Sequence, residues 1–333
     1  MTDTGVALDL DVSAARINIA AFQALLKGKK TEYGSTTAPN TDKKLSLDGD
    51  LRLRADVITL PSYTAQAVSM TISKTGDQIT ADLEHASICG IYLYGTLQAD
   101  DQGMEMSLNP RASGGKLDES LRCILHEDIG VSGDYDLSGH LTGSGPLKSF
   151  PRSLHGNLDF TARQGRIHND KVVHGVIEYL NSTSLLKGSH SSLLKEGVPY
   201  ETIVLRGALR EGTITLAEGS VKSKDLFITA EGTLDLSKDN LVLNVLVAPF
   251  SRLDRLLSKI PIVKDIAGNA LVVVPVRVEG TFNKPKVKPL PVSAVGMNVT
   301  NLMKNIVQAP VKIVEPVIPK GSEKVSNTGK DPF

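Results

Sequence analysis

In the stretch Leu45-Ser-Leu47-Asp-Gly-Asp-Leu51-Arg-Leu53-Arg-Ala55-Asp-Val57, aliphatic and polar residues alternate. A period of two places the aliphatic side chains on one face of a β-strand and the polar side chains on the other. The alternation recurs up to about Pro110, with turn residues between the runs, which indicates a meander of strands. Because the connections are short, we expect neighbouring strands to pair antiparallel.

Two further strand-rich blocks follow, from Gly130 to Gly165 and from Thr202 to Phe282. Glycine recurs inside their strands, as in Ala230-Glu-Gly-Thr-Leu234 and Val278-Glu-Gly-Thr-Phe282, and an interior glycine favours a bend or bulge. The sequence therefore predicts a mainly β protein: a curved antiparallel meander that forms an open groove or taco-like sheet, with a few short helices.

Apolar residues near a helical period predict short helices at Lys171–Leu186, Arg252–Ile260 and Leu302–Val307. The second should end at Lys259-Ile260-Pro261-Ile262, because the residue before a proline disfavours the α region. The strand that begins at Leu271 should then pair antiparallel with an earlier one, which we expect to be Leu241–Val247.

Composition excludes several classes of function. Lys plus Arg and Asp plus Glu each number 37 among 333 residues, so there is no basic excess to bind nucleic acid. Aromatic residues make up 4%, which leaves few platforms for bases or sugar rings. The seven histidines are scattered, and GxSxG, HExxH and P-loop motifs are absent from the sequence. We therefore expect no enzyme, no cofactor and no metal site.

The two cysteines, Cys89 and Cys123, lie in apolar, strand-like surroundings and outside any metal-binding spacing. They could be two separate buried thiols, because free cysteine behaves as a small hydrophobe. Alternatively they form one disulfide, which only an oxidising compartment would preserve. Both interpretations stay open at this point.

Aliphatic residues at period two also predict a shared surface on the three strands that begin near Leu226, Leu241 and Leu271. We expect the opposite faces of these strands to meet solvent, because they carry Thr229, Glu231, Asn244, Arg277 and Glu279. The shared surface is either the core of a sheet covered on both sides or a trough that receives acyl chains. The predicted lipid-binding residues are Leu226, Ile228, Leu243, Val245, Val272, Val274 and Val276.

Several local patterns from Gly130 to Pro310 resemble the C-terminal region of AsmA-like proteins, relatives of repeating β-groove lipid-transfer proteins. The most specific are Lys259-Ile-Pro-Ile-Val-Lys-Asp-Ile266 and Val278-Glu-Gly-Thr-Phe-Asn-Lys-Pro-Lys-Val287. The resemblance implies a periplasmic protein of a Gram-negative bacterium, anchored in the inner membrane and concerned with outer-membrane lipid homeostasis. It also implies that Cys89 and Cys123 are paired, as cysteines are in some of these proteins.

On this basis we expect an N-terminal β-meander at 1–129, an AsmA-like groove at 130–290, an extended or short-helical segment at 291–320 and a disordered tail at 321–333. The expected function is to bind or conduct phospholipid or other acyl chains, with membrane association through a segment missing from this chain. The alternative is a structural or assembly factor of the envelope that acts through protein contacts. A hydrolase is the third and least favoured class.

Overall fold

The structure is a computed structural model, and it describes residues 6–19, 47–146, 149–168, 171–182, 197–224, 226–249, 271–282, 284–307 and 311–313. Its strands are β1 (Val6–Asn18), β2 (Leu47–Thr59), β3 (Thr64–Thr75), β4 (Gln78–Ile88), β5 (Ile91–Ala99), β6 (Met104–Lys116), β7 (Val131–Gly145), β8 (His155–Ile167), β9 (Val198–Arg210), β10 (Thr213–Lys222), β11 (Leu226–Asp235), β12 (Asn240–Pro249), β13 (Leu271–Thr281), β14 (Lys284–Pro289) and β15 (Val311–Ile313). Its helices are α2 (Leu117–Leu125), α3 (Phe150–Ser153), α4 (Lys171–Ser182) and α7 (Met297–Val307), with a 3-10 turn at Val292–Ala294.

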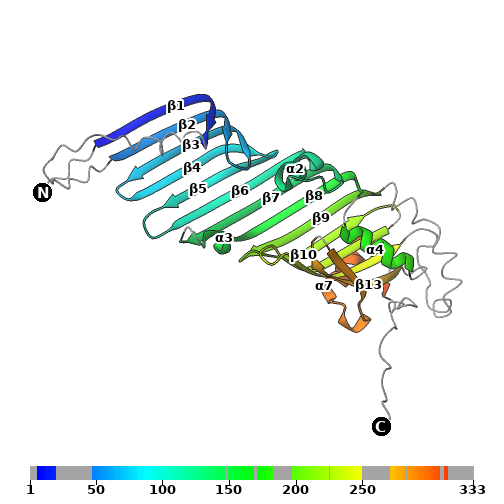
Figure 1. Ribbon diagram of the computed structural model, residues 1–333. Helices are drawn as coiled ribbons and strands as arrows, with labels where there is room; N and C mark the ends of the chain where they lie inside the picture. Colours follow the sequence, from blue (N-terminus) through cyan, green and yellow to red (C-terminus); the bar gives the residue numbers. More distant parts are fainter. Residues whose placement is uncertain are drawn as a thin grey trace, which may run out of the picture. The chain divides into compact units, whose positions relative to one another are not determined.

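The protein is mainly β, as the alternation predicts, and its sheet is open rather than closed into a barrel. The strand order follows the chain from β1 to β14, while β15 lies beside β13. Figure 1 shows strands β1 to β7 in this order. The predicted strand at Leu271 pairs antiparallel with Leu241–Val247, which confirms that prediction.

The first strand departs from the predicted antiparallel meander, because β1 pairs parallel with β2. Residues 19–46 separate the two strands, and a parallel pair needs a connection of about a dozen residues or more. The short-connection argument therefore does not apply to this pair. The alternation itself is the same in both kinds of pairing, so it could not reveal the direction.

The chain divides into two compact units, which we describe separately. Unit 1 comprises 1–163 and 206–214, and unit 2 comprises 164–205 and 215–333. The boundaries of the regions 1–129, 130–290, 291–320 and 321–333 remain predictions.

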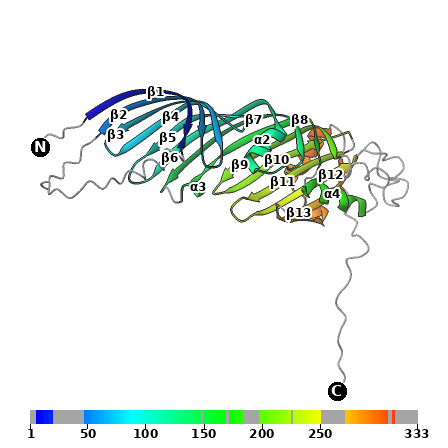
Figure 2. The ribbon, with the colours of Figure 1, turned by 45° about the horizontal axis from the view of Figure 1, so that its top comes forward.

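In unit 1, strands β1 to β7 lie side by side in sequence order (Figure 2). Their pairing is irregular between Gln66 and Ser69, between Leu83 and Ala86, and between Ala112 and Gly115. Bulges of this kind bend strands and increase their twist. They bend the strands of unit 1, whereas the bends that interior glycines predict lie in the later strands, from Gly130 onward.

Interior glycines also permit close approach between strands. Gly95 of β5 has φ +155°, and a Cβ there would lie 2.0 Å from the carbonyl oxygen of Ser107. Gly232 of β11 has φ +146°, and a Cβ would lie 2.1 Å from the carbonyl oxygen of Val242. Only glycine fits such positions without displacing the neighbouring backbone.

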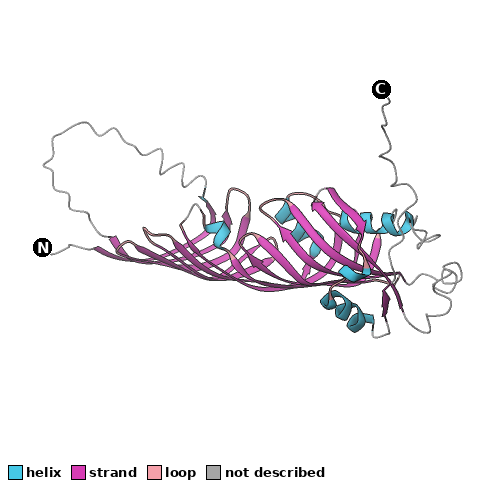
Figure 3. Cartoon of the chain, turned by 90° about the horizontal axis from the view of Figure 1, so that it is seen from below, coloured by secondary structure: helices cyan, strands magenta, loops and turns pink. Residues whose placement is uncertain are grey.

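In unit 2, helices lie on both faces of the strands (Figure 3). Helix α7 buries Val299 and Met303 against one face, where they form a cluster with Phe227, Leu246, Ala248 and Val273. Helix α4 packs against β14, and its Gly175 approaches the side chain of Val287. Val287 pairs with Val278, whose partner on β12 is Leu243, so α4 lies over the other face.

The helices agree in part with the sequence analysis. Residues 171–182 are helical as predicted, and 183–186 lie outside the described residues. The C-terminal helix begins at Met297 rather than at Leu302. The predicted helix at Arg252–Ile260, its end at Pro261 and the tail 321–333 also lie outside the described residues.

Candidate functional site

One face of unit 1 carries aliphatic side chains on every strand from β1 to β7. Residues that pair across neighbouring strands point to the same side of a sheet. One cross-strand row runs through Leu10, Leu51, Ile72, Ala81, Leu97 and Met106, and the next through Val12, Leu53, Met70, Leu83, Gly95, Leu108 and Leu141. We call these two rows, together with Leu8 and Ile79 of the adjoining row, the aliphatic face.

The aliphatic face is not sealed from solvent. Leu10 is 48% exposed and Ile79 is 41% exposed, and most of the other side chains are half-buried. Helix α2 packs against β6 and β7, and α3 packs against β7. A contiguous apolar surface of this kind marks a binding or interaction site more often than scattered surface leucines do.

The opposite face of the same strands is polar. Arg52 lies 3.1 Å from Asp9, and Arg54 lies 3.5 Å from Asp11. Further along come Thr71, Thr80 and Thr96, which follow the same alternation. These exposed ion pairs add little stability. Their effect is to make the sheet amphipathic, with one wet face and one aliphatic face.

The predicted lipid-binding residues lie in unit 2 rather than on this surface. The register places Leu226, Ile228, Leu243, Val245, Val274 and Val276 on one face, and their exposed fractions are between 0% and 8%. The side chain of Val272 lies outside the described residues, although its backbone belongs to β13 and pairs with Lys312 of β15. The described members of the set are thus core side chains, on the face that α4 covers.

One expectation for the opposite face of these strands is wrong. The sequence predicts that Thr229 faces solvent, but Thr229 is fully buried, and its hydroxyl donates to the carbonyl oxygen of Val299 at 3.4 Å. Helix α7 covers this end of the strands. Farther along, Glu279 accepts from the side chains of Arg277 and Lys288 and is partly exposed, as expected.

The open alternative for the cysteines is resolved in favour of a disulfide. Cys89 and Cys123 are bonded, with their Cα atoms 5.5 Å apart. Their setting differs from the strand-like one expected, because Cys123 lies on α2 and Cys89 lies at the turn between β4 and β5 with φ 54°. The bond therefore ties a helix to the end of the sheet.

Several exposed polar side chains of unit 1 have structural partners. A ring nitrogen of His140 lies 2.9 Å from the side-chain oxygen of Asn109, and His155 lies 3.0 Å from the hydroxyl of Thr142. Asp134 accepts from Lys116 at 2.6 Å. Within the described ranges, no group of three or more His, Cys, Asp or Glu could hold a metal ion.

Among the helices that the structure describes, none combines the length and apolarity needed to cross a bilayer. No family model, curated protein or solved structure matches the chain. The resemblance to AsmA-like proteins therefore rests on the quoted motifs alone.

Proposed function

We propose that the protein is a non-catalytic, periplasmic envelope protein that binds acyl chains of phospholipid on the aliphatic face of unit 1. In this role it would contribute to outer-membrane lipid homeostasis. The observation that carries the proposal is the pair of aliphatic rows across β1 to β7, which are half-exposed and lie back to back with a polar face.

The size and chemistry of this surface suit an acyl chain. At about 4.8 Å between strands, β1 to β7 spans about 29 Å, about twice the depth of one leaflet's hydrocarbon layer of about 15 Å. The side chains in the rows are aliphatic, so they contact methylene groups without leaving a hydrogen-bonding group unsatisfied. Burial of a methylene group is worth about 0.8 kcal/mol, so no catalytic chemistry is needed to hold a lipid.

The proposed compartment rests on two arguments. The Cys89–Cys123 disulfide is of a kind that persists in oxidising compartments such as the bacterial periplasm. The resemblance to AsmA-like proteins points to the same compartment, and anchoring in the inner membrane rests on that resemblance alone.

Two substitutions at adjacent positions of β3 test the proposal. Ile72 belongs to the aliphatic face, and Thr71 points to the polar face. We expect native mass spectrometry to find phospholipid bound to the wild type and to Thr71→Asp, and little on Ile72→Asp. All three proteins should retain their β circular dichroism. Wild-type protein purified from the envelope without lipid would contradict the proposal.

The alternative is a structural or assembly factor that acts through protein contacts, and the side-chain-filled core of unit 2 favours it. In that case the aliphatic face would pack against another protein. The same preparation would then contain no lipid, and Ile72→Asp would weaken a protein complex instead.

A further inference from the structure

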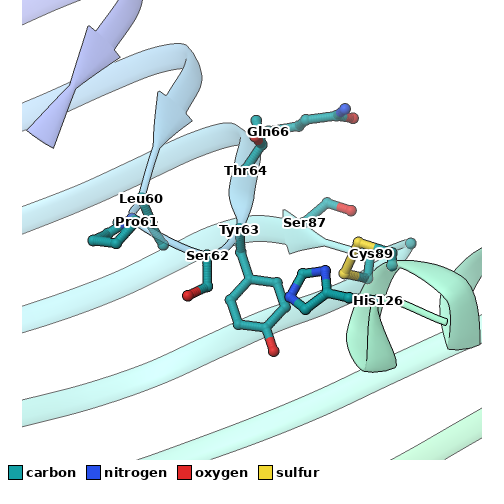
Figure 4. Close-up of a pocket in the computed structure, with 11 residues that line it drawn as sticks. Leu60, Pro61, Ser62, Tyr63, Thr64, Gln66, Ser87, Cys89 and His126 are labelled. Carbon is teal, nitrogen blue, oxygen red and sulfur yellow. A yellow bond between two sulfur atoms is a disulfide. The ribbon is translucent and has the colours of Figure 1, made fainter. Parts of the chain in front are cut away.

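A cavity of about 500 Å³ lies in unit 1 at the end of the sheet where β2 turns into β3 (Figure 4). This volume is within the range of about 300 to 1,000 Å³ that is typical of small-ligand sites. The lining comes from the β2–β3 loop, the ends of β3 and β4, the disulfide and the end of α2. The lining residues are Leu60, Pro61, Ser62, Tyr63, Thr64, Gln66, Ser87, Cys89, Gly90, Cys123 and His126.

The cavity and the aliphatic face share one apolar cluster. Leu60 lines the cavity and packs against buried residues that include Ala55 and Val68. Leu53 and Met70 of the aliphatic face pack against the same cluster. A molecule with an apolar and a polar part can therefore place its apolar part on the aliphatic face and its polar part in the cavity.

The polar groups of the cavity can both accept and donate hydrogen bonds. The lining includes the hydroxyl residues Ser62, Thr64 and Ser87 and the amide residue Gln66. Among the described residues that line the cavity, none is Lys, Arg, Asp or Glu. An anion would find no fixed positive charge in this lining.

Helix α2 adds a preference for positive charge. Its carboxyl end reaches the cavity at Cys123 and His126, and the last carbonyl groups of a helix carry a partial negative charge. Tyr63 fixes this end, because its hydroxyl donates to the carbonyl oxygen of Ile124 at 3.2 Å. The Tyr63 ring also stacks on His126 at 5.4 Å between centroids, so an aromatic surface lies beside the cavity.

We propose that this cavity binds the primary ammonium end of a phospholipid headgroup of the ethanolamine type while the acyl chains lie on the aliphatic face. A primary ammonium carries three N–H donors for the hydroxyl, amide and carbonyl oxygens around it. The inference rests on the proposed function and adds a headgroup preference to it.

Competition between two lipids tests the inference. Delipidated full-length protein is mixed with equal amounts of phosphatidylethanolamine and phosphatidylglycerol that carry identical acyl chains, and bound lipid is counted by native mass spectrometry. We expect the wild type to take up several-fold more phosphatidylethanolamine. Ser87→Lys and Gln66→Lys place a cation in the cavity and should reverse the ratio without reducing total lipid. Ser73→Lys, on the polar face of β3, is the matched control and should leave the ratio unchanged.

Each outcome bears on one of the two proposals. Equal uptake by the wild type, or a ratio that neither lysine variant alters, overturns the headgroup site and leaves the acyl-chain proposal standing. No uptake of either lipid overturns the proposed function. Displacement of lipid by free ethanolamine at tenfold excess would show a site for a soluble amine and would also overturn the headgroup inference.

Discussion

The strands of units 1 and 2 both carry aliphatic residues, but the two units differ in how far the apolar faces of these strands are buried. In unit 1 the strict alternation of β2, Leu51-Arg52-Leu53-Arg54, leaves one apolar face and one charged face. In unit 2, β12 is apolar on both faces, with Val245 on one and Leu246 on the other, and both are buried. A strand with two apolar faces needs cover on each side. The comparison shows that the more hydrophobic strands form the core, and the less hydrophobic ones leave the open surface.

The largest predicted effect on stability comes from comparing one substitution, to aspartate, on the buried face of unit 2 and on the aliphatic face of unit 1. Val245 is 3% exposed, so Val245→Asp buries an unpaired charge and should cost several kcal/mol, enough to unfold unit 2. Ile72→Asp places its charge on a half-exposed surface and should cost about 1 kcal/mol or less. Hydrogen exchange measured peptide by peptide localises the loss. Equal losses of protection in the two variants would mean that the aliphatic face of unit 1 is a core as well.

Loss of the disulfide should come next in size and should affect unit 1 alone. Cys89 and Cys123 are 34 residues apart, and closing a loop of that length stabilises by about 3 to 4 kcal/mol in the chain-entropy model. The double variant Cys89→Ser/Cys123→Ser should therefore lose protection in unit 1, above all in α2. Reduction of the wild type is the control for the substitutions. If hydrogen-exchange protection falls equally in unit 2, the two units do not unfold independently of each other.

The main features of the fold could be predicted because they have local signals. The period of two gave the strands, and the pairing of Leu271 with Leu241–Val247 followed from order along the chain. The parallel pairing of β1 and the helix α2 could not be predicted in this way. Helix α2 is held by tertiary contacts, namely the bond from Cys123 and the hydrogen bond from the Tyr135 hydroxyl to Ser120 at 2.8 Å. Neither contact leaves a periodic pattern in the sequence.

The candidate site was harder to predict for a different reason. The strands around Val245 and Val276 are apolar on one face and partly apolar on the other, and this pattern fits a covered core as well as a ligand surface. Whether an apolar face is open depends on which helix packs against it. Helix α4 covers the face that carries Val245 and Val276, and it ends at Ser182, more than fifty residues before β12 begins. The signal that could have found the aliphatic face is the strict alternation itself, which leaves only one face apolar.

A smaller effect should be common to both units. Gly95→Ala and Gly232→Ala each place a Cβ about 2 Å from a neighbouring carbonyl oxygen, at a φ that L residues rarely adopt. Backbone strain of this kind costs about 1 to 3 kcal/mol, so each variant should lose that much in its own unit. Gly76→Ala is the control for space, because a Cβ there would meet no atom within 4 Å. If Gly95→Ala is no less stable than Gly76→Ala, close approach between β5 and β6 does not constrain the sheet.

The smallest effect is a dependence on pH that should differ between the units. At the end of β11, Asp235 accepts from the Ser237 hydroxyl at 2.7 Å and from the Lys238 ammonium at 3.0 Å, and these contacts lower its pKa to about 2. The pKa is depressed in the folded state, so the stabilisation is complete above the unfolded value of about 4 and is lost as the pH falls from about 4 to about 2. Asp235→Asn should therefore reduce the loss of stability that unit 2 shows as the pH falls from about 4 to about 2.

A matched carboxylate in unit 1 shows whether the pH effect stays within one unit. The Arg163 guanidinium and the backbone N–H of Gly114 lower the pKa of Asp136, so Asp136→Asn should reduce the loss of stability at acid pH in unit 1 alone. Hydrogen exchange at pH 5 and pH 2.5, corrected for the intrinsic exchange rate, measures both variants. Each variant should reduce the pH difference in its own unit and leave the other unit unchanged. A reduction in both units would mean that they unfold as one, and the contrast between an open and a covered sheet would then have to be drawn within a single cooperative structure.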